Sequence, residues 1–176
     1  AKNFSTINLT EGRAYIWNVY CNDSAGNGAW YSSNYSITVE HITLPFSATW
    51  NTSKTSTGSS NSTTISLPLE STGIYDFTVD WGDGNISIVT AWNTINSNHT
   101  YGTEGVYAIN ITGTIVGFRF NAVGDKDKII KITNWGVLRV GNSGDYFYGC
   151  SNLNSNATDN LDLTGTTDLS LMFSEA

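Results

Sequence analysis

Three aspartates near the middle of the chain are the first candidates for chemistry. Asp76, Asp80 and Asp83 could supply oxygen ligands to calcium, an ion that takes six to eight of them. Their spacing lacks the Asp-x-Asp-x-Asp alternation that wraps a loop around calcium. A strand rises about 3.4 Å per residue, so Asp76 and Asp80 should stand about 14 Å apart. Turn chemistry explains Asp83-Gly84, because aspartate bonds its own backbone and glycine tolerates positive φ. We therefore expect no cofactor, and a loop-stiffening Ca²⁺ is the one candidate.

Residues suited to acid–base or nucleophilic catalysis are few. The chain has two histidines, of which His41 is expected to be solvated in a linker. The Gly-Asn-Ser-Gly-Asp run at 141–145 does not match the Gly-x-Ser-x-Gly pattern and is interpreted as a turn. Cys21 and Cys150 form no metal motif, and both fall where core residues are expected, so we predict two buried free thiols. The sequence assigns no catalytic, metal-binding or cofactor-binding residue, and it predicts a protein that is not an enzyme.

The composition narrows the class of protein further. Only 13% of the 176 residues are charged, while 12% are aromatic, and Asn, Ser, Thr and Gly supply most of the polarity. This balance favours an all-β surface protein over a helical one. The net charge is −7 with eight Lys and Arg, too few for a basic patch that neutralises several phosphates. We therefore expect no nucleic-acid partner, and without a run of about 20 apolar residues no membrane insertion within this chain.

Strands must position the aspartates. Tyr75, Phe77, Val79 and Trp81 alternate with polar residues, which predicts one buried face of a strand that ends in the Asp83-Gly84 turn. Further strands are expected at 4–9, 14–21, 35–39, 46–50, 64–69, 86–91, 106–112 and 115–120. The Ser/Thr/Asn/Gly-rich loop at 51–63 is expected to be mobile.

The motif around the turn carries a family resemblance. The run Asp80-Trp81-Gly82-Asp83-Gly84 is followed later in the sequence by His99-Thr100-Tyr101 and then by Gly105-Val106-Tyr107. Together these segments resemble the core signature of the polycystic-kidney-disease (PKD) domain, a β-sandwich of extracellular proteins. The resemblance implies that residues 41–122 form such a sandwich, that His99 has a structural hydrogen-bonding role, and that the domain is a spacer or adhesion module.

The flanking segments have their own resemblances. In residues 1–40, Tyr15, Trp17, Val19 and Cys21 share one strand face, and the segment resembles the last strands of an immunoglobulin-like or fibronectin-like module. In residues 123–176, the motif at Phe147–Leu153 begins to repeat 26 residues later at Phe173. The segment resembles the start of BspA-type leucine-rich repeats of microbial surface proteins. The run 125–128 (Asp-Lys-Asp-Lys) is expected to be solvated at the junction. The expected fold is all-β, an Ig-like/PKD β-sandwich flanked by a partial Ig-like unit and a leucine-rich-repeat cap.

Potential glycosylation sites are frequent. Ten Asn-x-Ser/Thr sequons occur, about twice the number expected from the composition, which is typical of an exported glycoprotein and also of a chain biased toward these residues. The candidate asparagines are Asn3, Asn8, Asn22, Asn34, Asn51, Asn61, Asn85, Asn98, Asn110 and Asn156.

These features predict a non-enzymatic structural or adhesion module of an archaeal or bacterial cell-surface protein, located outside the cell. Its expected partners are other copies of itself or neighbouring surface proteins, assembled into a filament, sheath or surface layer. The alternative is a carbohydrate-binding accessory or spacer module of a secreted polysaccharide-degrading enzyme. Trp17 and Trp81 lie on expected core faces, whereas Trp30, Trp50, Trp92 and Trp135 could stack on sugars or pack in a core.

Overall fold

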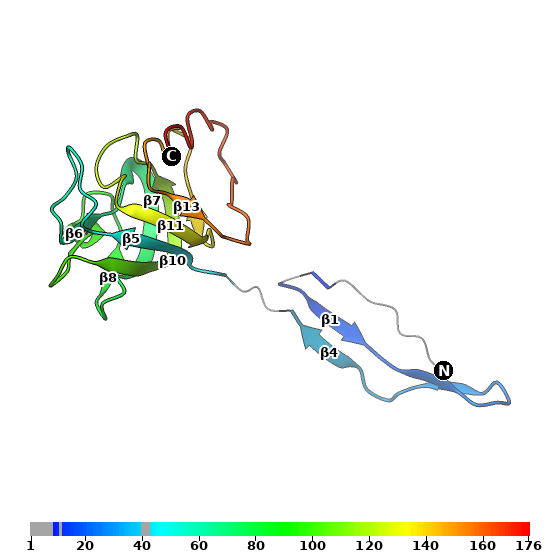
Figure 1. The fold of residues 1–176 in the computed structure, drawn as a ribbon. Helices are drawn as coiled ribbons and strands as arrows, with labels where there is room; N and C mark the ends of the chain where they lie inside the picture. The colour runs from blue at the N-terminus through cyan, green and yellow to red at the C-terminus, as the bar shows by residue number, and fades with distance from the viewer. Residues whose placement is uncertain (1–8, 11, 40–42) are drawn as a thin grey trace. The chain divides into compact units, whose positions relative to one another are not determined.

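The chain forms two compact units. The computed structural model describes residues 9–10, 12–39 and 43–176, and the units divide between Ile42 and Thr43 (Figure 1). The strand expected at 4–9 lies outside the described residues except for its last position, and His41 lies outside them as well. The described secondary structure is almost all strand, which confirms the all-β class. Residues 123–176, expected as a third domain, belong to the same compact unit as the middle segment.

The first unit is a long two-stranded ribbon. Strand β1 (Ala14–Trp17) pairs antiparallel with β4 (Tyr35–Thr38), and β2 (Tyr20–Asn22) pairs antiparallel with β3 (Gly28–Trp30). The single strand expected at 14–21 is therefore two strands, separated at Asn18, whose side chain donates to the carbonyl oxygen of Tyr31 and accepts from the Val19 N–H. Strand β3 was not expected, since Gly28 and the preceding turn residues favour a loop.

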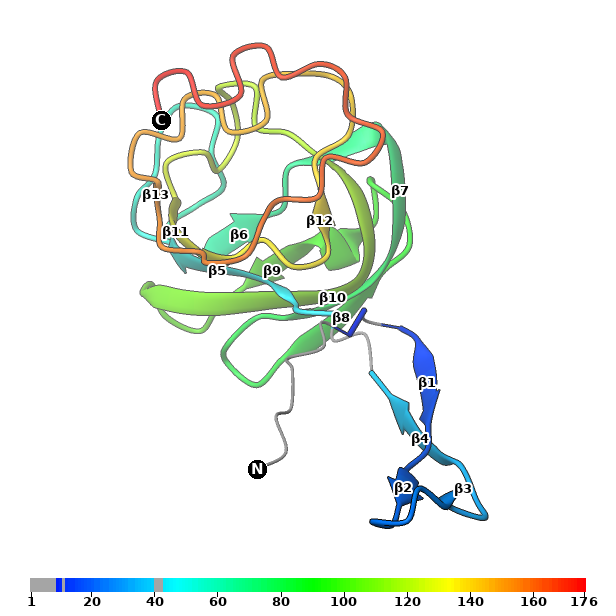
Figure 2. The same ribbon diagram turned by 90° about the vertical axis from the view of Figure 1, so that its right-hand side faces the viewer.

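The second unit is built on a mixed sheet with the strand order β13-β11-β5-β10-β7-β8, to which β12 adds by pairing with β10 (Figure 2). Strands β5, β10, β7 and β8 are antiparallel neighbours, and β6 and β9 form a separate antiparallel pair. Its elements are β5 (Phe46–Asn51), β6 (Thr64–Ser66), β7 (Leu69–Asp80), β8 (Ile86–Val89), the 3₁₀-helix η1 (Ile95–Ser97), β9 (Asn98–Thr100), β10 (Val106–Phe118), β11 (Ile129–Asn134), β12 (Leu138–Arg139) and β13 (Asn154–Ser155).

The core lies on one face of this sheet. The expected alternation is confirmed, because Tyr75, Phe77, Val79 and Trp81 are all buried. Register carries the same face across the sheet: Ile111 lies opposite both Phe46 of β5 and Val79 of β7. These side chains form one apolar cluster with residues of β6 and of the C-terminal segment.

Strand β10 joins two strands that were expected to be separate. A break was expected at Gly113-Thr114, but pairing with β7 runs through Gly113, which lies opposite Phe77. Gly113 adopts a φ of 105°, and a Cβ there would lie 2.5 Å from the Asp76 carbonyl oxygen. Glycine therefore allows the close approach of β7 and the continuation of the strand.

The C-terminal segment coils in stacked turns. Phe120 N–H donates to Tyr146 O (2.8 Å), and one turn further on Phe147 N–H donates to Met172 O (2.8 Å). The rings of Phe147 and Phe173 stack with centroids 5.4 Å apart. The 26-residue spacing seen in the sequence thus relates neighbouring turns of the coil. Strand β11 ties this segment to the sheet by pairing with β5, which explains why no unit boundary falls at residue 122.

Candidate interaction surfaces

The residues of the Asp-Trp-Gly-Asp-Gly signature come together around the buried indole of Trp81. Its Nε1 donates to Ser87 Oγ (2.9 Å), and its carbonyl oxygen accepts from the Tyr101 hydroxyl (2.9 Å). The ring of His99 stacks on Trp81 at 5.1 Å, and the ring of Tyr107 stacks on Tyr101 at 3.6 Å. Burial raises the pKa of Tyr101 above its ordinary value. The cluster stabilises the fold, because the Trp81 indole N–H, the Tyr101 hydroxyl and His99 Nε2 each bond to another group of the protein.

The acidic turn is held by its own side chains. Gly82 and Gly84 have φ of 80° and 91°, Asp80 Oδ1 accepts from the Gly82 N–H, and Asp83 Oδ1 accepts from the Asn85 N–H. The structure therefore confirms the turn chemistry predicted for Asp83-Gly84. At the edge of the signature, Gly105 N–H donates to Thr52 Oγ1 (2.9 Å).

His99 and Asp83 form the pair that acid–base chemistry would need. His99 Nε2 lies 2.8 Å from Asp83 Oδ2. Burial acts to raise the pKa of Asp83, but hydrogen bonds from His99 and Asn85 outweigh it and leave this pKa below its ordinary value. A carboxylate of lowered pKa that is already bonded through both oxygens is a poor proton acceptor, so the pair supports the turn.

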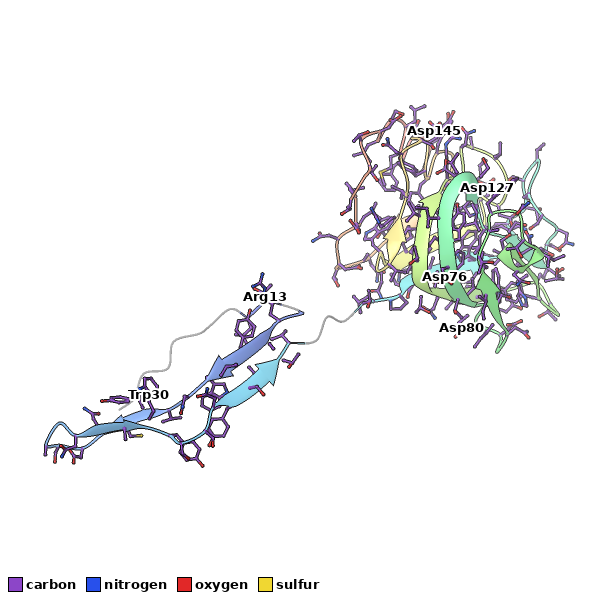
Figure 3. All side chains as sticks on the ribbon, turned by 180° about the vertical axis from the view of Figure 1, so that it is seen from behind. Arg13, Trp30, Asp76, Asp80, Asp127 and Asp145 are labelled. Carbon is purple, nitrogen blue, oxygen red and sulfur yellow. The ribbon has the colours of Figure 1, made fainter. Side chains whose placement is uncertain are left out.

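The three aspartates do not converge on one point. Asp76 and Asp80 lie along β7, as Figure 3 shows, and Asp83 lies in the turn beyond it. Across residues 9–10, 12–39 and 43–176, no group of three His, Cys, Asp or Glu side chains is arranged to hold a metal ion.

The tryptophans divide differently from the expectation. Trp50 is fully buried and packs against Phe120, so of the two roles left open for it the structure supports core packing and excludes sugar stacking. Trp92 is 48% exposed, and Trp135 is partly buried against Phe147. Trp17, expected in a core, is half exposed, because the described part of the first unit contains no second sheet to cover it.

The ribbon presents one continuous apolar face. The register pairs Tyr15 with Ile37 and Trp17 with Tyr35, which places all four side chains on the same side. The ring of Tyr35 stacks on Trp17 at 4.7 Å and on Tyr31 at 5.6 Å, so the face continues past Asn18 into the second half of the ribbon. There a shallow hollow is lined by Val19, Cys21, Ala29, Tyr31 and Tyr35 of this face, together with Trp30, which pairs with Tyr20. The side chains of the ribbon, Trp30 among them, project from the strands in Figure 3.

We call the set Tyr15, Trp17, Val19, Cys21, Ala29, Tyr31, Tyr35 and Ile37 the ribbon face. The sequence placed its first four members on one side, and the structure confirms this through the β1–β4 register for Tyr15 and Trp17 and through the shared hollow for Val19 and Cys21. The alternation alone could not predict that the ribbon face is exposed to solvent.

The two cysteines have opposite environments. Cys150 is fully buried as expected, and burial raises the pKa of its thiol to about 12. Cys21 is exposed on the ribbon face, so the expectation of a buried thiol is wrong there. The strand that carries Cys21 has the predicted alternation, but no described element of its unit packs over it.

The charged run at 125–128 was expected to be solvated, but two of its four residues are buried and the other two are only partly exposed. Asp125 is 2% exposed and the Lys128 side chain is completely buried, because the run folds under the 51–63 loop. The loop expected to be mobile is thereby tied to the sheet unit by buried polar bonds. Burial lowers the pKa of Lys128, while the charge of Asp125 opposes that effect.

The described sequons differ in accessibility. Asn22, Asn34, Asn61, Asn85, Asn98 and Asn156 are exposed, and Asn51 is half-buried. Asn110 lies within β10, where its Oδ1 accepts from the Ser47 hydroxyl (2.6 Å). Asn3 and Asn8 lie outside the described residues. The exposed sites are the ones that can carry a bulky glycan without rearrangement.

Comparisons with protein-family models, curated proteins and solved structures found no match. No helix among the described residues is long and apolar enough to cross a membrane.

Proposed function

We propose that this chain is a non-enzymatic structural and adhesion module of an archaeal or bacterial cell-surface protein. In this proposal it works outside the cell and joins its own protein to other copies or to neighbouring surface proteins in a filament, sheath or surface layer. The PKD-like signature around Trp81, the immunoglobulin-like pattern of the ribbon and the leucine-rich-repeat-like coil support the proposed setting, since such modules occur together in surface proteins. The observation that carries the proposal is the open ribbon face.

A two-stranded ribbon is marginal by itself in water, so a second layer over its apolar face would stabilise it substantially. Trp17, Tyr31 and Tyr35 are 42–54% exposed, and Val19 and Ile37 are exposed to a similar degree. Because a buried aromatic side chain covers about 150–250 Å², the exposed apolar area of this face is roughly 400 Å². A patch of that size is typical of interaction sites, and two such faces packed together would bury about 800 Å² in total.

That area lies at the low end for specific interfaces, so the expected association is weak and depends on concentration. Size-exclusion chromatography with light scattering over about a hundredfold dilution series tests this. We expect a mass above 19.1 kDa at high concentration that falls toward this value on dilution. A mass that stays at the monomer value across the series would contradict the proposed self-association.

The carbohydrate-binding alternative is favoured by the exposed ring of Trp92 beside η1. An exposed indole can stack on the apolar face of a sugar. Glycan-array binding that Trp92→Ala abolishes, with thermal stability unchanged, would support this alternative over the structural module.

A further inference from the structure

The ammonium group of Lys128 is surrounded by oxygen atoms. Its Nζ lies 2.8 Å from Asn61 O, 2.8 Å from Thr64 O and 3.0 Å from Ser60 O. Ser60 Oγ is 2.6 Å away, and Asp125 Oδ1 is 3.3 Å away. The whole Lys128 side chain is inaccessible to solvent. We call these five oxygens the 60–64 cage.

The number of oxygens exceeds what hydrogen bonding to an ammonium group requires. An ammonium group has three N–H donors, yet five oxygens surround this one at 2.6–3.3 Å, and three of them are backbone carbonyls. Rings of carbonyl oxygens are what replace the hydration shell of K⁺ in proteins. The five oxygens around Lys128 Nζ are therefore arranged as the ligands of a spherical cation would be, and they also serve as hydrogen-bond acceptors for the ammonium group.

The cage is held by bonds that do not involve Lys128. Ser60 N–H donates to Asp125 Oδ1 (2.7 Å), and Ser66 N–H donates to Asp125 Oδ2 (2.7 Å). Thr64 N–H donates to Asn61 O (3.2 Å). These bonds fix the carbonyl and carboxylate oxygens in place, so the cage should keep its shape when the lysine is shortened.

Charge and distance indicate the class of cation. A single carboxylate, that of Asp125, faces the site, so one positive charge balances it. Calcium binds oxygens at 2.3–2.6 Å and recruits several carboxylates, whereas these oxygens stand 2.6–3.3 Å from the ammonium nitrogen at the centre of the cage. A large monovalent cation fits both the charge and the size.

We propose that the 60–64 cage is a monovalent-cation site that the chain fills with its own lysine ammonium group. Lys128 thus acts as a built-in cation that locks the 51–63 loop onto the 125–128 run. Removal of the lysine head should leave a site that binds K⁺.

The test compares two variants of the full chain. Lys128→Ala removes the charge and opens the space, whereas Lys128→Met removes the charge and fills the space with an uncharged chain of similar length. Thermal unfolding is followed in KCl and in choline chloride at equal concentration, because choline is too large for the cage. At a K⁺ concentration about ten times the dissociation constant, the unfolding equilibrium constant of Lys128→Ala should fall about tenfold, which raises its Tm by about 3–6 °C. The wild type and Lys128→Met should show no such difference.

Each outcome decides the question. Equal shifts in both variants would mean a general salt effect and overturn the proposal, as would a larger response to CaCl₂ than to KCl. If Lys128→Ala is unfolded in choline chloride, recovery of its native circular dichroism in KCl supports the site, and an unfolded chain in both salts overturns it. None of these outcomes depends on self-association through the ribbon face.

Discussion

Substitution of Trp50 tests most sharply how the core is built. The indole is fully buried and projects from β5, the strand that pairs with both β10 and β11, and its ring centroid lies 5.9 Å from that of Phe120. Truncation of a buried aromatic ring to alanine removes its apolar contacts and leaves a cavity, so Trp50→Ala should lower the free energy of unfolding by about 3–5 kcal/mol. For a chain of this size that corresponds to a Tm lower by about 6–20 °C.

A second substitution separates packing from polarity. Trp50 Nε1 is buried, and no acceptor among the described residues reaches it. An unpaired buried donor costs about 1–3 kcal/mol, and Trp50→Phe removes that cost while it keeps an aromatic ring in the core. The lost volume and the relieved donor should nearly cancel, so we expect Trp50→Phe to lie within about 1 kcal/mol of the wild type.

Thermal and denaturant unfolding measure both changes, and Trp92→Ala is the matched control. Trp92 is 48% exposed, so its truncation should change the free energy of unfolding by less than about 0.5 kcal/mol. The reasoning is refuted if Trp50→Ala costs less than about 1 kcal/mol, or if Trp50→Phe costs as much as Trp50→Ala.

The remaining predictions concern other parts of the chain. The pKa of Asp83 lies below its ordinary value of 3.8, so this carboxylate stabilises the fold above that pH, and the stabilisation is lost as the pH falls through the lower folded-state pKa. Asp83→Asn should therefore flatten the dependence of Tm on pH in this acidic range. An unchanged dependence would argue against the His99–Asp83 pair. Gly113→Ala should cost more than about 1 kcal/mol in denaturant unfolding, because its positive φ strains alanine and a Cβ would also meet the Asp76 carbonyl; Gly84→Ala shares the positive φ but has open space around it, so it should cost less than Gly113→Ala. A thiol reagent should modify Cys21 and spare the buried Cys150 until unfolding, so two reactive thiols in the native chain would contradict the core. Glycopeptide mass spectrometry of native material should find glycans at Asn85 and Asn98 and none at Asn110, and the reverse pattern would be inconsistent with β10.

Patterns confined to neighbouring residues predicted much of this fold. Alternation placed Tyr75, Phe77 and Val79 on a buried face, and turn chemistry placed the Asp83-Gly84 turn, because both depend only on local backbone geometry. The 26-residue spacing from Phe147 to Phe173 is also visible without a structure, since stacked turns repeat the same environment.

Features that depend on distant partners could not be predicted in this way. Lys128 and Asp125 look like a solvated charge run until the chain brings Ser60 and Thr64 over them, more than 55 residues away in sequence. Trp50 and Trp92 are both tryptophans in polar surroundings, and only the pairing of β5 between β10 and β11 shows which one is buried. The exposure of Trp17 likewise depends on a layer that its own unit does not supply among the described residues.

The central claim is that the ribbon face joins this chain to another protein surface, with a second copy as the simplest partner. Sedimentation velocity at one high protein concentration tests it most directly, with Trp17→Ser on the ribbon face compared with Trp92→Ser, a matched exposed tryptophan in the other unit. We predict that the wild type and Trp92→Ser sediment as associated species and that Trp17→Ser sediments as a monomer of 19.1 kDa. Identical sedimentation of Trp17→Ser and the wild type would contradict the claim.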